Sequence, residues 1–258
     1  MSGRLAGRAA YVTGARRGIG RGIALALAAE GASVVVADLE LAGVESVAAE
    51  IHASGGRAEP FVVDVTKWND LNALVAYVER QFGSLDIAVN CAGVISVAAV
   101  EDISESEWDR VMDVNTKGVF LSCKAAVPAM KRNGFGRIIN ISSVSGKDGF
   151  PKLALYSASK YAVLGFTNSL AKEVARDGIT ANAICPGVVK TPMWSLLSEE
   201  FKGQGETAEE SWQRHVLEFV PQGRPQTPEE IGNLAVYLAL APSVTGQSIN
   251  IDGGLTSH

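Results

Sequence analysis

Tyr156 and Lys160 form a pair that could carry acid–base chemistry, in the run Tyr156-Ser157-Ala158-Ser159-Lys160. Their spacing places both side chains on one face of a helix. A neighbouring ammonium favours ionised tyrosine, and a tyrosine whose pKa falls from roughly 10 toward neutrality can exchange a proton with an alcohol oxygen. Exposed helix pairs with the same spacing contribute only roughly 0.2–0.5 kcal/mol and do no chemistry, so the pair alone leaves both interpretations open.

Two further polar residues are placed where they could serve this pair. Ser143 lies just past a predicted strand over 137–141, which delivers it to the edge where Tyr156 should emerge, although serines after strands also form ordinary loops. Asn115 lies within a predicted helix over about 104–131. An Asn there lowers helix stability and needs hydrogen-bond partners, which indicates a role in the site.

A glycine-rich turn joins the first predicted strand to the first predicted helix. The run from Thr13 to Gly20 contains Gly14, Arg17, Gly18, Ile19 and Gly20. Glycines at this position let the backbone approach a pyrophosphate, and the helix N-terminus favours its negative charge. A tight turn without a ligand could have the same composition, but the location between strand and helix predicts a dinucleotide site.

Asp38 ends the second predicted strand, 18 residues after Gly20. A carboxylate there can accept hydrogen bonds from both ribose hydroxyls of NAD and would repel the 2′-phosphate of NADP. Arg17 could instead attract that phosphate. We weigh Asp38 more heavily, because it should point directly at the ribose, and predict NAD as the cofactor.

Three more residues follow strands at the same edge of the sheet. Asp64 and Val65 come after the third strand, and Asn90 ends the fourth. We predict that they contact the cofactor, with Asp64 accepting from the adenine amino group. Each could also be a turn residue that caps a helix or loop.

Composition narrows the function class. The chain has 258 residues, 47% hydrophobic and 20% charged, which is typical of a globular protein with a sizeable core. A net charge of -5 without a long basic run argues against nucleic acid or an anionic membrane as partner. No apolar run reaches the roughly 18 residues of a membrane span, and no signal-peptide pattern opens the chain.

The cysteines and histidines are scattered. Cys91, Cys123 and Cys185 are odd in number and far apart, which favours free, mostly buried thiols in a reducing cytoplasm. We therefore expect a cytoplasmic protein. Since no cluster of Cys, His or carboxylate ligands is evident, we predict no catalytic metal.

Short β-branched runs alternate with longer amphipathic segments. Strands are predicted at 9–13, 34–38, a run ending at 61–63, 86–90, 137–141, 180–184 and 248–251, and helices over about 18–30, 41–54, 67–82, 104–131, 155–176 and from 227 onward. Apolar strands alternating with helices indicate parallel βαβ units. We predict one α/β domain over 1–258: a doubly wound Rossmann fold with a seven-stranded parallel sheet and helices on both faces.

The segment 190–226 interrupts this alternation. It lacks a predicted strand and carries apolar residues, among them Trp194, Phe201 and Trp212. It could be a surface insertion of two short helices or a mobile lid over a substrate pocket. We favour the lid, because the segment follows the carboxyl end of the sixth strand, where such sheets bind ligands.

Together these residues resemble the short-chain dehydrogenase/reductase family over nearly the whole chain. The matching positions are Thr13-Gly14…Gly18-Ile19-Gly20, Asp64, Asn90…Ala92-Gly93, Asn115, Ser143, Tyr156…Lys160 and Pro186-Gly187…Thr191. The resemblance implies that Tyr156 is the general acid/base and that Lys160 lowers its pKa and holds the nicotinamide ribose. It further implies that Ser143 binds the substrate oxygen and Asn115 holds a water that links Lys160 to solvent.

The resemblance extends to the cofactor, the assembly and the substrate. Val189 and Thr191 would bind the carboxamide and phosphates, and the family usually forms homotetramers through its two long helices and C-terminal strand. The stretch 185–194 looks like acetoin (diacetyl) reductases, also called butanediol dehydrogenases, and sugar-alcohol dehydrogenases. Residues that could line an apolar substrate pocket, or equally pack in the core or lid, are Phe150, Leu155, Val188 and Trp194.

We therefore predict an NAD-dependent dehydrogenase acting on a small secondary alcohol, hydroxyketone or polyol. One alternative is an NADPH-dependent 3-oxoacyl thioester reductase, against which Asp38 argues. Another is a dinucleotide-binding sensor without catalysis, which would not need Ser143, Tyr156 or Lys160, yet all three are present.

Overall fold

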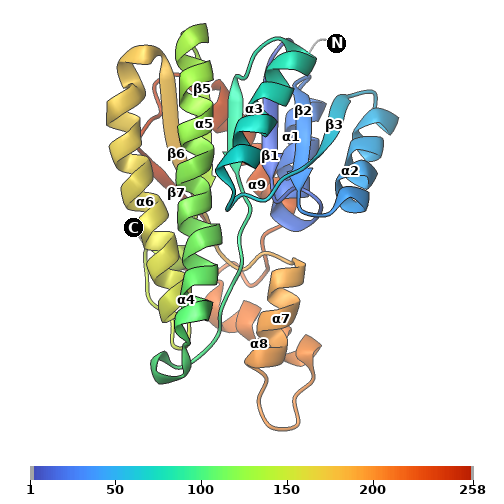
Figure 1. Cartoon of the computed structure of the whole chain (residues 1–258). Coiled ribbons are helices and arrows are strands. Elements are labelled where there is room, and N and C mark those ends of the chain that lie inside the picture. Colours follow the sequence, from blue (N-terminus) through green and yellow to red (C-terminus); the bar gives the residue numbers. More distant parts are fainter. Residues whose placement is uncertain (1–2, 257–258) are drawn as a thin grey trace.

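The computed structural model describes residues 3–256 and contains one parallel sheet (Figure 1). Its strands are β1 (Ala9–Thr13), β2 (Ser33–Asp38), β3 (Arg57–Val62), β4 (Ile87–Asn90), β5 (Gly136–Ile141), β6 (Ile179–Pro186) and β7 (Ser248–Ile251). They lie in the order β3-β2-β1-β4-β5-β6-β7. The direction of winding reverses between β1 and β4, which is where doubly wound sheets bind ligands. The predicted fold is confirmed.

Helices cover both faces of the sheet (Figure 1). One face carries α1 (Gly18–Ala29), α2 (Leu41–Ala53) and α9 (Pro228–Leu240), and the other carries α3 (Trp68–Phe82), α5 (Gly118–Asn133) and α6 (Ala154–Val174). The strands alternate between the two cores: Val12 packs with the first group, whereas Tyr11 packs with the second. Burial on both faces explains why the strands are continuous apolar runs.

The helix predicted over 104–131 contains a break in its hydrogen-bond pattern. It consists of α4 (Glu105–Met112), a π-helical turn (Asp113–Lys117) and α5, which ends at Asn133. Such π turns insert one extra residue per turn and often occur at functional sites. Asn115 lies within this turn and is fully buried. The amphipathic pattern of residues 104–131 does not indicate the insertion.

Two short helices form the segment predicted as an insertion or lid. These are α7 (Pro192–Glu200) and α8 (Ala208–Phe219), which project beyond the carboxyl ends of the strands (Figure 1). Val189 and Gln226 form an isolated parallel bridge, and the Gln226 N–H donates to the Val188 carbonyl at 2.9 Å. The segment between Val189 and Gln226 therefore leaves the rest of the protein and returns to it at this bridge.

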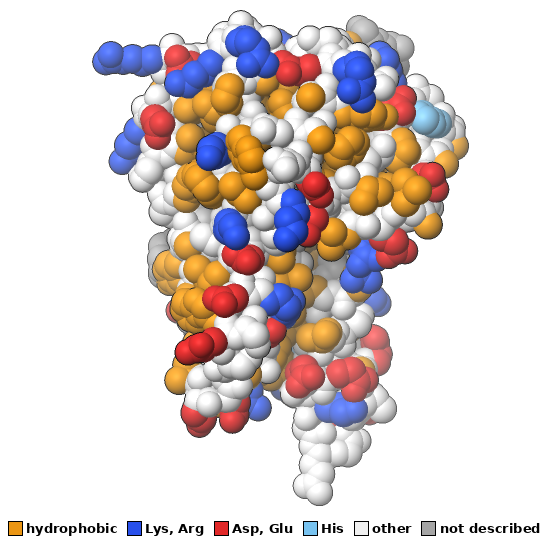
Figure 2. All heavy atoms as spheres, in the orientation of Figure 1, with side chains coloured by type: hydrophobic (Ala, Val, Ile, Leu, Met, Phe, Trp, Pro, Cys, Tyr) orange, Lys and Arg blue, Asp and Glu red, His pale blue; other side chains and the backbone are white. Residues whose placement is uncertain are grey.

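The surface and the thiols are ordinary in charge and pairing. On the face seen in Figure 2, charges of both signs are interspersed. Among residues 3–256, no helix is long and apolar enough to cross a membrane, and no group of three His, Cys, Asp or Glu residues could hold a metal ion. The three cysteines are free; Cys123 and Cys185 are buried, and Cys91 is partly exposed.

Helices α1 and α9 approach closely because each places a glycine at the contact. A Cβ on Gly232 would lie 2.7 Å from the Ala26 Cβ and 2.8 Å from the Gly22 carbonyl oxygen. We expect Gly232→Ala to lower the free energy of unfolding by about 1–3 kcal/mol, because it overpacks this contact. Urea denaturation measures the change.

Gly165→Ala is the matched control. Gly165 is exposed in α6, and a Cβ there would meet no atom within 4 Å. This substitution should raise the free energy of unfolding by roughly 0.5–1 kcal/mol, because alanine loses less chain entropy in a helix. Equal effects of the two substitutions would show that α1–α9 packing does not depend on the glycine.

Candidate active site

A cavity of about 900 Å³ opens at the carboxyl ends of the strands and gathers most of the predicted site residues. Those that line it are Gly14, Arg17, Gly18, Ile19, Gly20, Asp38, Asp64, Val65, Ser143, Tyr156, Lys160, Val189 and Thr191. Asn90 and Asn115 are not among its lining residues. The topology thus brings together residues that are far apart in the sequence, at the point where the order of the strands reverses.

Two glycines of the turn, Gly14 and Gly20, have no room for a side chain. Gly14 and Gly18 have φ values of +67° and +56°, a conformation that favours glycine. A Cβ on Gly14 would lie 2.7 Å from the Ala92 Cα, and one on Gly20 would overlap the Gly14 carbonyl. The first turn of α1 has neither a side-chain cap nor an acidic residue, so its N–H groups remain available for an anion. These features fit the pyrophosphate of a dinucleotide.

Asp38 is fixed at the rim of the cavity by Arg16 rather than Arg17. Its carboxylate accepts from the backbone N–H groups of Arg16 (3.2 Å) and Leu39 (2.8 Å). The Arg16 guanidinium lies 3.3 Å from Asp38 Oδ1 and also pairs with Glu40. Arg17 is exposed. Arg16 was not predicted from the sequence. A second carboxylate, at Glu40, was the one signal that a cation would lie near Asp38.

Asp64 lines the cavity and also caps a turn. Its Oδ1 accepts from the Thr66 backbone N–H at 2.9 Å and from the Thr66 hydroxyl at 2.7 Å. Its own N–H donates to Asp70 Oδ2 at 3.1 Å. These contacts fix the start of α3 against the end of β3.

Asn90 differs from the prediction, since its side chain turns away from the cavity. Its Nδ2 donates to Asn140 Oδ1 at 2.7 Å, and its Oδ1 accepts from the Ser122 hydroxyl at 2.6 Å. The alternation of side chains along β4 sends Asn90 into the layer beneath α5 and α6. Its amide joins the ends of β4 and β5.

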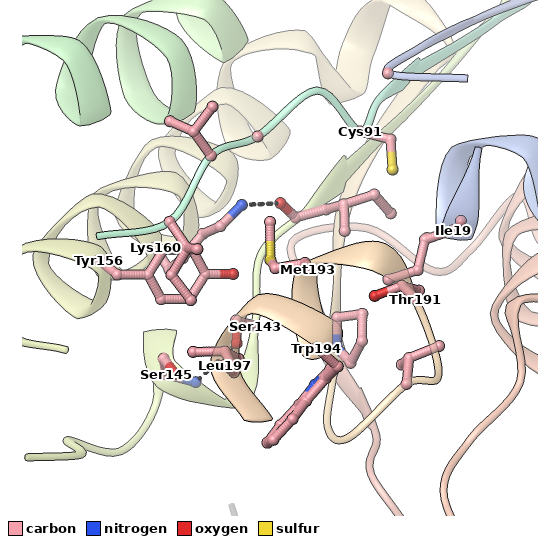
Figure 3. Close-up of a pocket in the computed structure, with 18 of the residues that line it drawn as sticks. Ile19, Cys91, Ser143, Ser145, Tyr156, Lys160, Thr191, Met193, Trp194 and Leu197 are labelled. Atoms are coloured by element: carbon pink, nitrogen blue, oxygen red, sulfur yellow. Dashed lines mark hydrogen bonds between the residues drawn. The ribbon is translucent and has the colours of Figure 1, made fainter. Parts of the chain in front are cut away.

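Ser143, Tyr156 and Lys160 meet at the inner end of the cavity (Figure 3). Ser143 follows β5, whereas Tyr156 and Lys160 come from consecutive turns of α6. Figure 3 shows Tyr156 and Ser143 close to each other, with Met193, Trp194 and Leu197 across from them. The Lys160 ammonium donates to the Ile141 carbonyl at 3.0 Å and lies 5.6 Å from the centre of the Tyr156 ring.

The protonation states differ from the sequence-based expectation. Burial raises the pKa of Tyr156 to about 12, and a hydrogen bond from Ser143 offsets only part of this rise. Burial likewise lowers the pKa of Lys160 to about 8. The predicted lowering of the tyrosine pKa by Lys160 is therefore not produced by the protein's own groups. Spacing alone does not show that both residues lie in a low-dielectric layer, where burial outweighs the charge.

Asn115 lies behind this group and connects two segments of the site. Its Nδ2 donates to the Val94 carbonyl at 2.8 Å and to the Ser159 hydroxyl at 3.0 Å, and its Oδ1 accepts from the Val94 N–H at 2.8 Å. The Ser159 hydroxyl in turn donates to the Tyr156 carbonyl at 2.7 Å. The amide thus holds the loop after β4 against the turn of α6 that carries Tyr156.

The remaining wall of the cavity is apolar and aromatic. Phe150, Val188 and Trp194 line it, whereas Leu155 does not. Leu155 is buried against a separate small hollow, because the residue next to Tyr156 points about 100° away around the helix. Residues of this wall that sequence reasoning missed include Phe219 and His215. The helical spacing of Trp212, His215, Val216 and Phe219 could have indicated a common inward face.

Asn115→Ala should lower the free energy of unfolding by about 1–3 kcal/mol, because it leaves buried partners at Val94 and Ser159 unsatisfied. Denaturant titration of the purified variant measures the loss. Asn168→Ala is the control, since Asn168 is exposed and makes one 3.3 Å hydrogen bond to the Gly246 carbonyl. A loss at Asn115 no larger than at Asn168 would refute the connecting role.

Comparison with known proteins identifies relatives over almost the full length. Residues 8–202 match the family described as short chain dehydrogenase. The 3-oxoacyl-[acyl-carrier-protein] reductase FabG of Thermotoga maritima is 39% identical over 254 residues, covering 98% of this chain and 99% of the relative. The galactitol 2-dehydrogenase of Agrobacterium fabrum is 40% identical, covering 97% and 98%. The D-beta-hydroxybutyrate dehydrogenase of Cupriavidus necator is 39% identical, covering 97% and 98%.

Solved structures show the same fold. A variant of actinorhodin polyketide ketoreductase with NADPH superposes with a TM-score of 0.93 at 38% identity, covering 99% of both chains. A short-chain type dehydrogenase/reductase from Mycobacterium marinum gives a TM-score of 0.89 at 36% identity, covering 98% of this chain and 96% of that one.

Proposed function

We propose that this chain, which belongs to the short-chain dehydrogenase/reductase family, transfers a hydride between NAD and a secondary alcohol or ketone, with Tyr156 as general acid/base. One observation carries the proposal. Ser143, Tyr156 and Lys160 open into the same cavity as the glycine turn and Asp38. A proton-transfer group and a dinucleotide site in one cavity are what alcohol–ketone interconversion requires.

The cofactor would lie along the edge of the sheet. The N-terminus of α1 would bind the pyrophosphate, and Asp38 the adenosine ribose. Thr191 lies across the turn, since a Cβ on Gly18 would be 3.4 Å from its Cγ2, and with Val189 it would bind the carboxamide and phosphates. The nicotinamide, when bound, supplies or accepts the hydride.

Tyr156 would exchange the proton. Because its pKa is raised, Tyr156 is protonated at neutral pH and can donate to the oxygen of a ketone. The Ser143 hydroxyl would donate a hydrogen bond to the same oxygen and stabilise the charge that develops there. For alcohol oxidation Tyr156 must first lose its proton, and the Lys160 ammonium would stabilise the phenolate. Asn115 would position the helix turn that holds Tyr156.

The charges near Asp38 support NAD over NADP. Arg16 is engaged by two carboxylates, Asp38 and Glu40, so this corner of the cavity stays negative and would repel a 2′-phosphate. Arg17 is the cation that could oppose this preference. The alternative, an NADPH-dependent 3-oxoacyl thioester reductase, is supported by the name of the Thermotoga maritima relative and by the neighbour with NADPH.

For the substrate we propose a secondary alcohol, hydroxyketone or polyol, a class in which the galactitol dehydrogenase falls by name. The α7–α8 unit would serve as the lid, since it forms one wall of the cavity and is pinned at the Val189–Gln226 bridge. We also propose a homotetramer. Trp108, Phe120 and Tyr161 are exposed on α4, α5 and α6, and sedimentation analysis would test whether they meet another subunit.

The pH profile of ketone reduction tests the Tyr156–Lys160 pair. Because burial lowers the pKa of Lys160 to about 8, the ammonium is present below that pH and lost above it. We expect kcat/KM for reduction to decline above pH 8. Lys160→Arg keeps its charge and should lack this decline, although it will be slower. Tyr156→Phe should reduce turnover about 10²–10⁴-fold at every pH. An alkaline decline that persists in Lys160→Arg would assign it to another group.

Cofactor preference tests the role of Asp38 against that of Arg17. Asp38→Ala should shift the ratio of kcat/KM for NAD over NADP toward NADP by at least about tenfold, because it removes a repulsive charge near the 2′-position. Arg17→Ala is the matched variant in the same turn and should shift the ratio toward NAD. Both ratios are measured from initial rates at saturating alcohol. An unchanged ratio in Asp38→Ala would show that this carboxylate does not face the ribose.

A further inference from the structure

We propose that the substrate is a ketone or secondary alcohol bearing an aromatic group, and that His215 accepts a hydrogen bond from a hydroxyl on that group. The inference rests on the proposed function and narrows its substrate class. The part of the cavity beyond Tyr156 is called the distal chamber here. It is lined by Phe150, Trp194, Phe201, His215 and Phe219. Its walls come from the loop that precedes α6 and from the inner faces of α7 and α8.

The wall of the distal chamber is apolar around the reacting group. Tyr156 packs with Leu153 and Leu197, and partly buried Phe150, Trp194 and Phe201 pack against these three. A polyol bound here would place hydroxyls against carbon, and each unpaired group would cost about 1–3 kcal/mol. This argues for an apolar group next to the reacting carbon.

Aromatic rings line the far end of the chamber. Phe150 and Phe219 meet edge to face with centroids 6.3 Å apart, and Trp194 meets Trp212 in the same way at 5.6 Å. Phe150, Trp194 and Phe219 also line the cavity, so ring edges and faces are available to a bound molecule. Aromatic groups prefer such offset and edge-to-face contacts.

His215 adds one polar atom to this aromatic wall. Its ring lies 5.5 Å from that of Phe219, 5.8 Å from Phe201 and 6.2 Å from Trp194, and the residue is 6% exposed. Nδ1 lies 2.6 Å from the Ser211 carbonyl oxygen, so Nδ1 carries the hydrogen and Nε2 is an acceptor. Within residues 3–256 we find no hydrogen-bond partner for Nε2. A hydroxyl on the substrate could fill that role.

The charged residues around the chamber are already paired. The Arg110 guanidinium bonds both oxygens of Glu107 at 2.7 Å and the Ile95 carbonyl at 3.1 Å. Glu206, the charged neighbour of His215, accepts from Arg214 at 2.9 Å and from the Gly203 N–H at 2.7 Å. Hydrogen-bond recognition in this region therefore falls to the imidazole rather than to an ion pair with the substrate.

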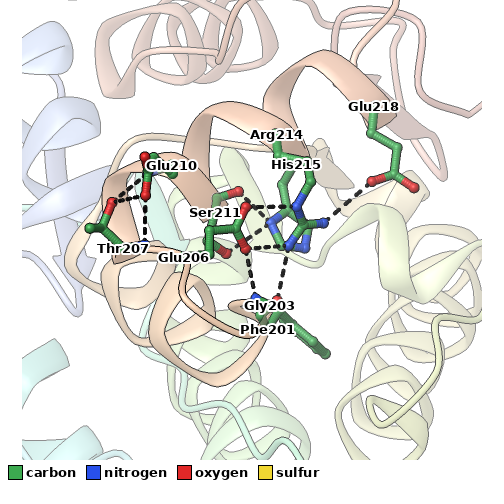
Figure 4. Close-up of polar contacts among 9 residues, drawn as sticks. All are labelled: Phe201, Gly203, Glu206, Thr207, Glu210, Ser211, Arg214, His215 and Glu218. Carbon is green, nitrogen blue, oxygen red and sulfur yellow. Dashed lines mark hydrogen bonds and ion pairs between the residues drawn. The ribbon is translucent and has the colours of Figure 1, made fainter.

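The polar contacts in Figure 4 hold the imidazole in place. Arg214 donates to the Phe201 carbonyl at 3.0 Å while it pairs with Glu206, and Thr207 and Glu210 form a capping box at the start of α8. The loop over 201–207 is thereby tied to the helix that carries His215. Phe201 and His215 are thus preorganised, which reduces the entropy lost when a ligand binds against them.

The experiment compares three ketones: a phenyl-substituted methyl ketone, its para-hydroxy analogue, and acetoin as a small hydroxyketone. We expect kcat/KM for the phenyl ketone to exceed that for acetoin at least tenfold. The para-hydroxy analogue should exceed the phenyl ketone by about threefold to tenfold, the range of one neutral hydrogen bond. Quenching of tryptophan fluorescence in Tyr156→Phe measures binding of the same ketones independently of turnover.

Variants on α8 separate recognition from stability. His215→Phe keeps an aromatic ring and should abolish the preference for the para-hydroxy analogue, while reduction of the phenyl ketone continues. His215→Gln, which retains an acceptor, should restore part of the preference. Gln213→Ala, at an exposed position of the same helix, should leave it unchanged. Denaturant titration confirms that each variant is folded.

The outcomes are distinguishable. Higher kcat/KM for acetoin than for both aryl ketones would overturn the aromatic substrate class and leave the proposed oxidoreductase function intact. An unchanged hydroxyl preference in folded His215→Phe would overturn the role of His215. Failure of the folded protein to reduce any of the ketones with either nicotinamide cofactor, together with absence of fluorescence quenching, would overturn both this inference and the proposed function.

Discussion

Burial of the Tyr156–Lys160 pair is the constraint on which the rest of the site depends. A buried phenol keeps its proton and a buried ammonium tends to lose one, so desolvation drives the two pKa values apart, to about 12 for Tyr156 and about 8 for Lys160. The Ile141 carbonyl, at the end of β5, accepts a hydrogen bond from the ammonium and offsets part of its cost. Tyr156 therefore keeps its proton near neutral pH, and its ionisation would require further positive charge nearby.

The irregular helix that faces α6 supports the same part of the site. A regular α-helix from 104 to 131 would have continued its hydrogen-bond pattern through Asn115. The π turn instead places a fully buried amide where it bonds both polar atoms of the Val94 backbone and the Ser159 hydroxyl. Loop and helix are then joined immediately behind Tyr156. A misplacement of about 1 Å at a reacting group can cost a hundredfold in rate, which gives such a connection its value.

The parts of the site that were predictable from sequence depend on local chain geometry. The glycine turn, Asp38, Ser143 and the Tyr156–Lys160 spacing each follow a strand end or a helix turn, and parallel topology brings strand ends to one edge. What was missed depends on side-chain direction or on distant segments. The side chain of Asn90 faces α5 because of its register in β4. Leu155 lies on a different face of α6 from Tyr156, and Arg16 forms an ion pair with Glu40. The directions of the pKa shifts of Tyr156 and Lys160 depend on their burial, which the spacing of the two residues in the sequence does not reveal.

His215 belongs to this second group and shows how the molecule divides its tasks. The sheet edge carries the groups that we propose for proton transfer and cofactor binding, and their position follows from the topology of the fold. The segment between Val189 and Gln226 contributes further walls of the cavity. Because it leaves and returns at one bridge, its helices can change composition without disturbing the strands that carry Ser143 or the glycine turn. Relatives at 39–40% identity that are named for substrates as different as an acyl-carrier thioester and galactitol are consistent with that separation. Here these walls are aromatic, and His215 adds an imidazole that contacts Trp194, Phe201 and Phe219.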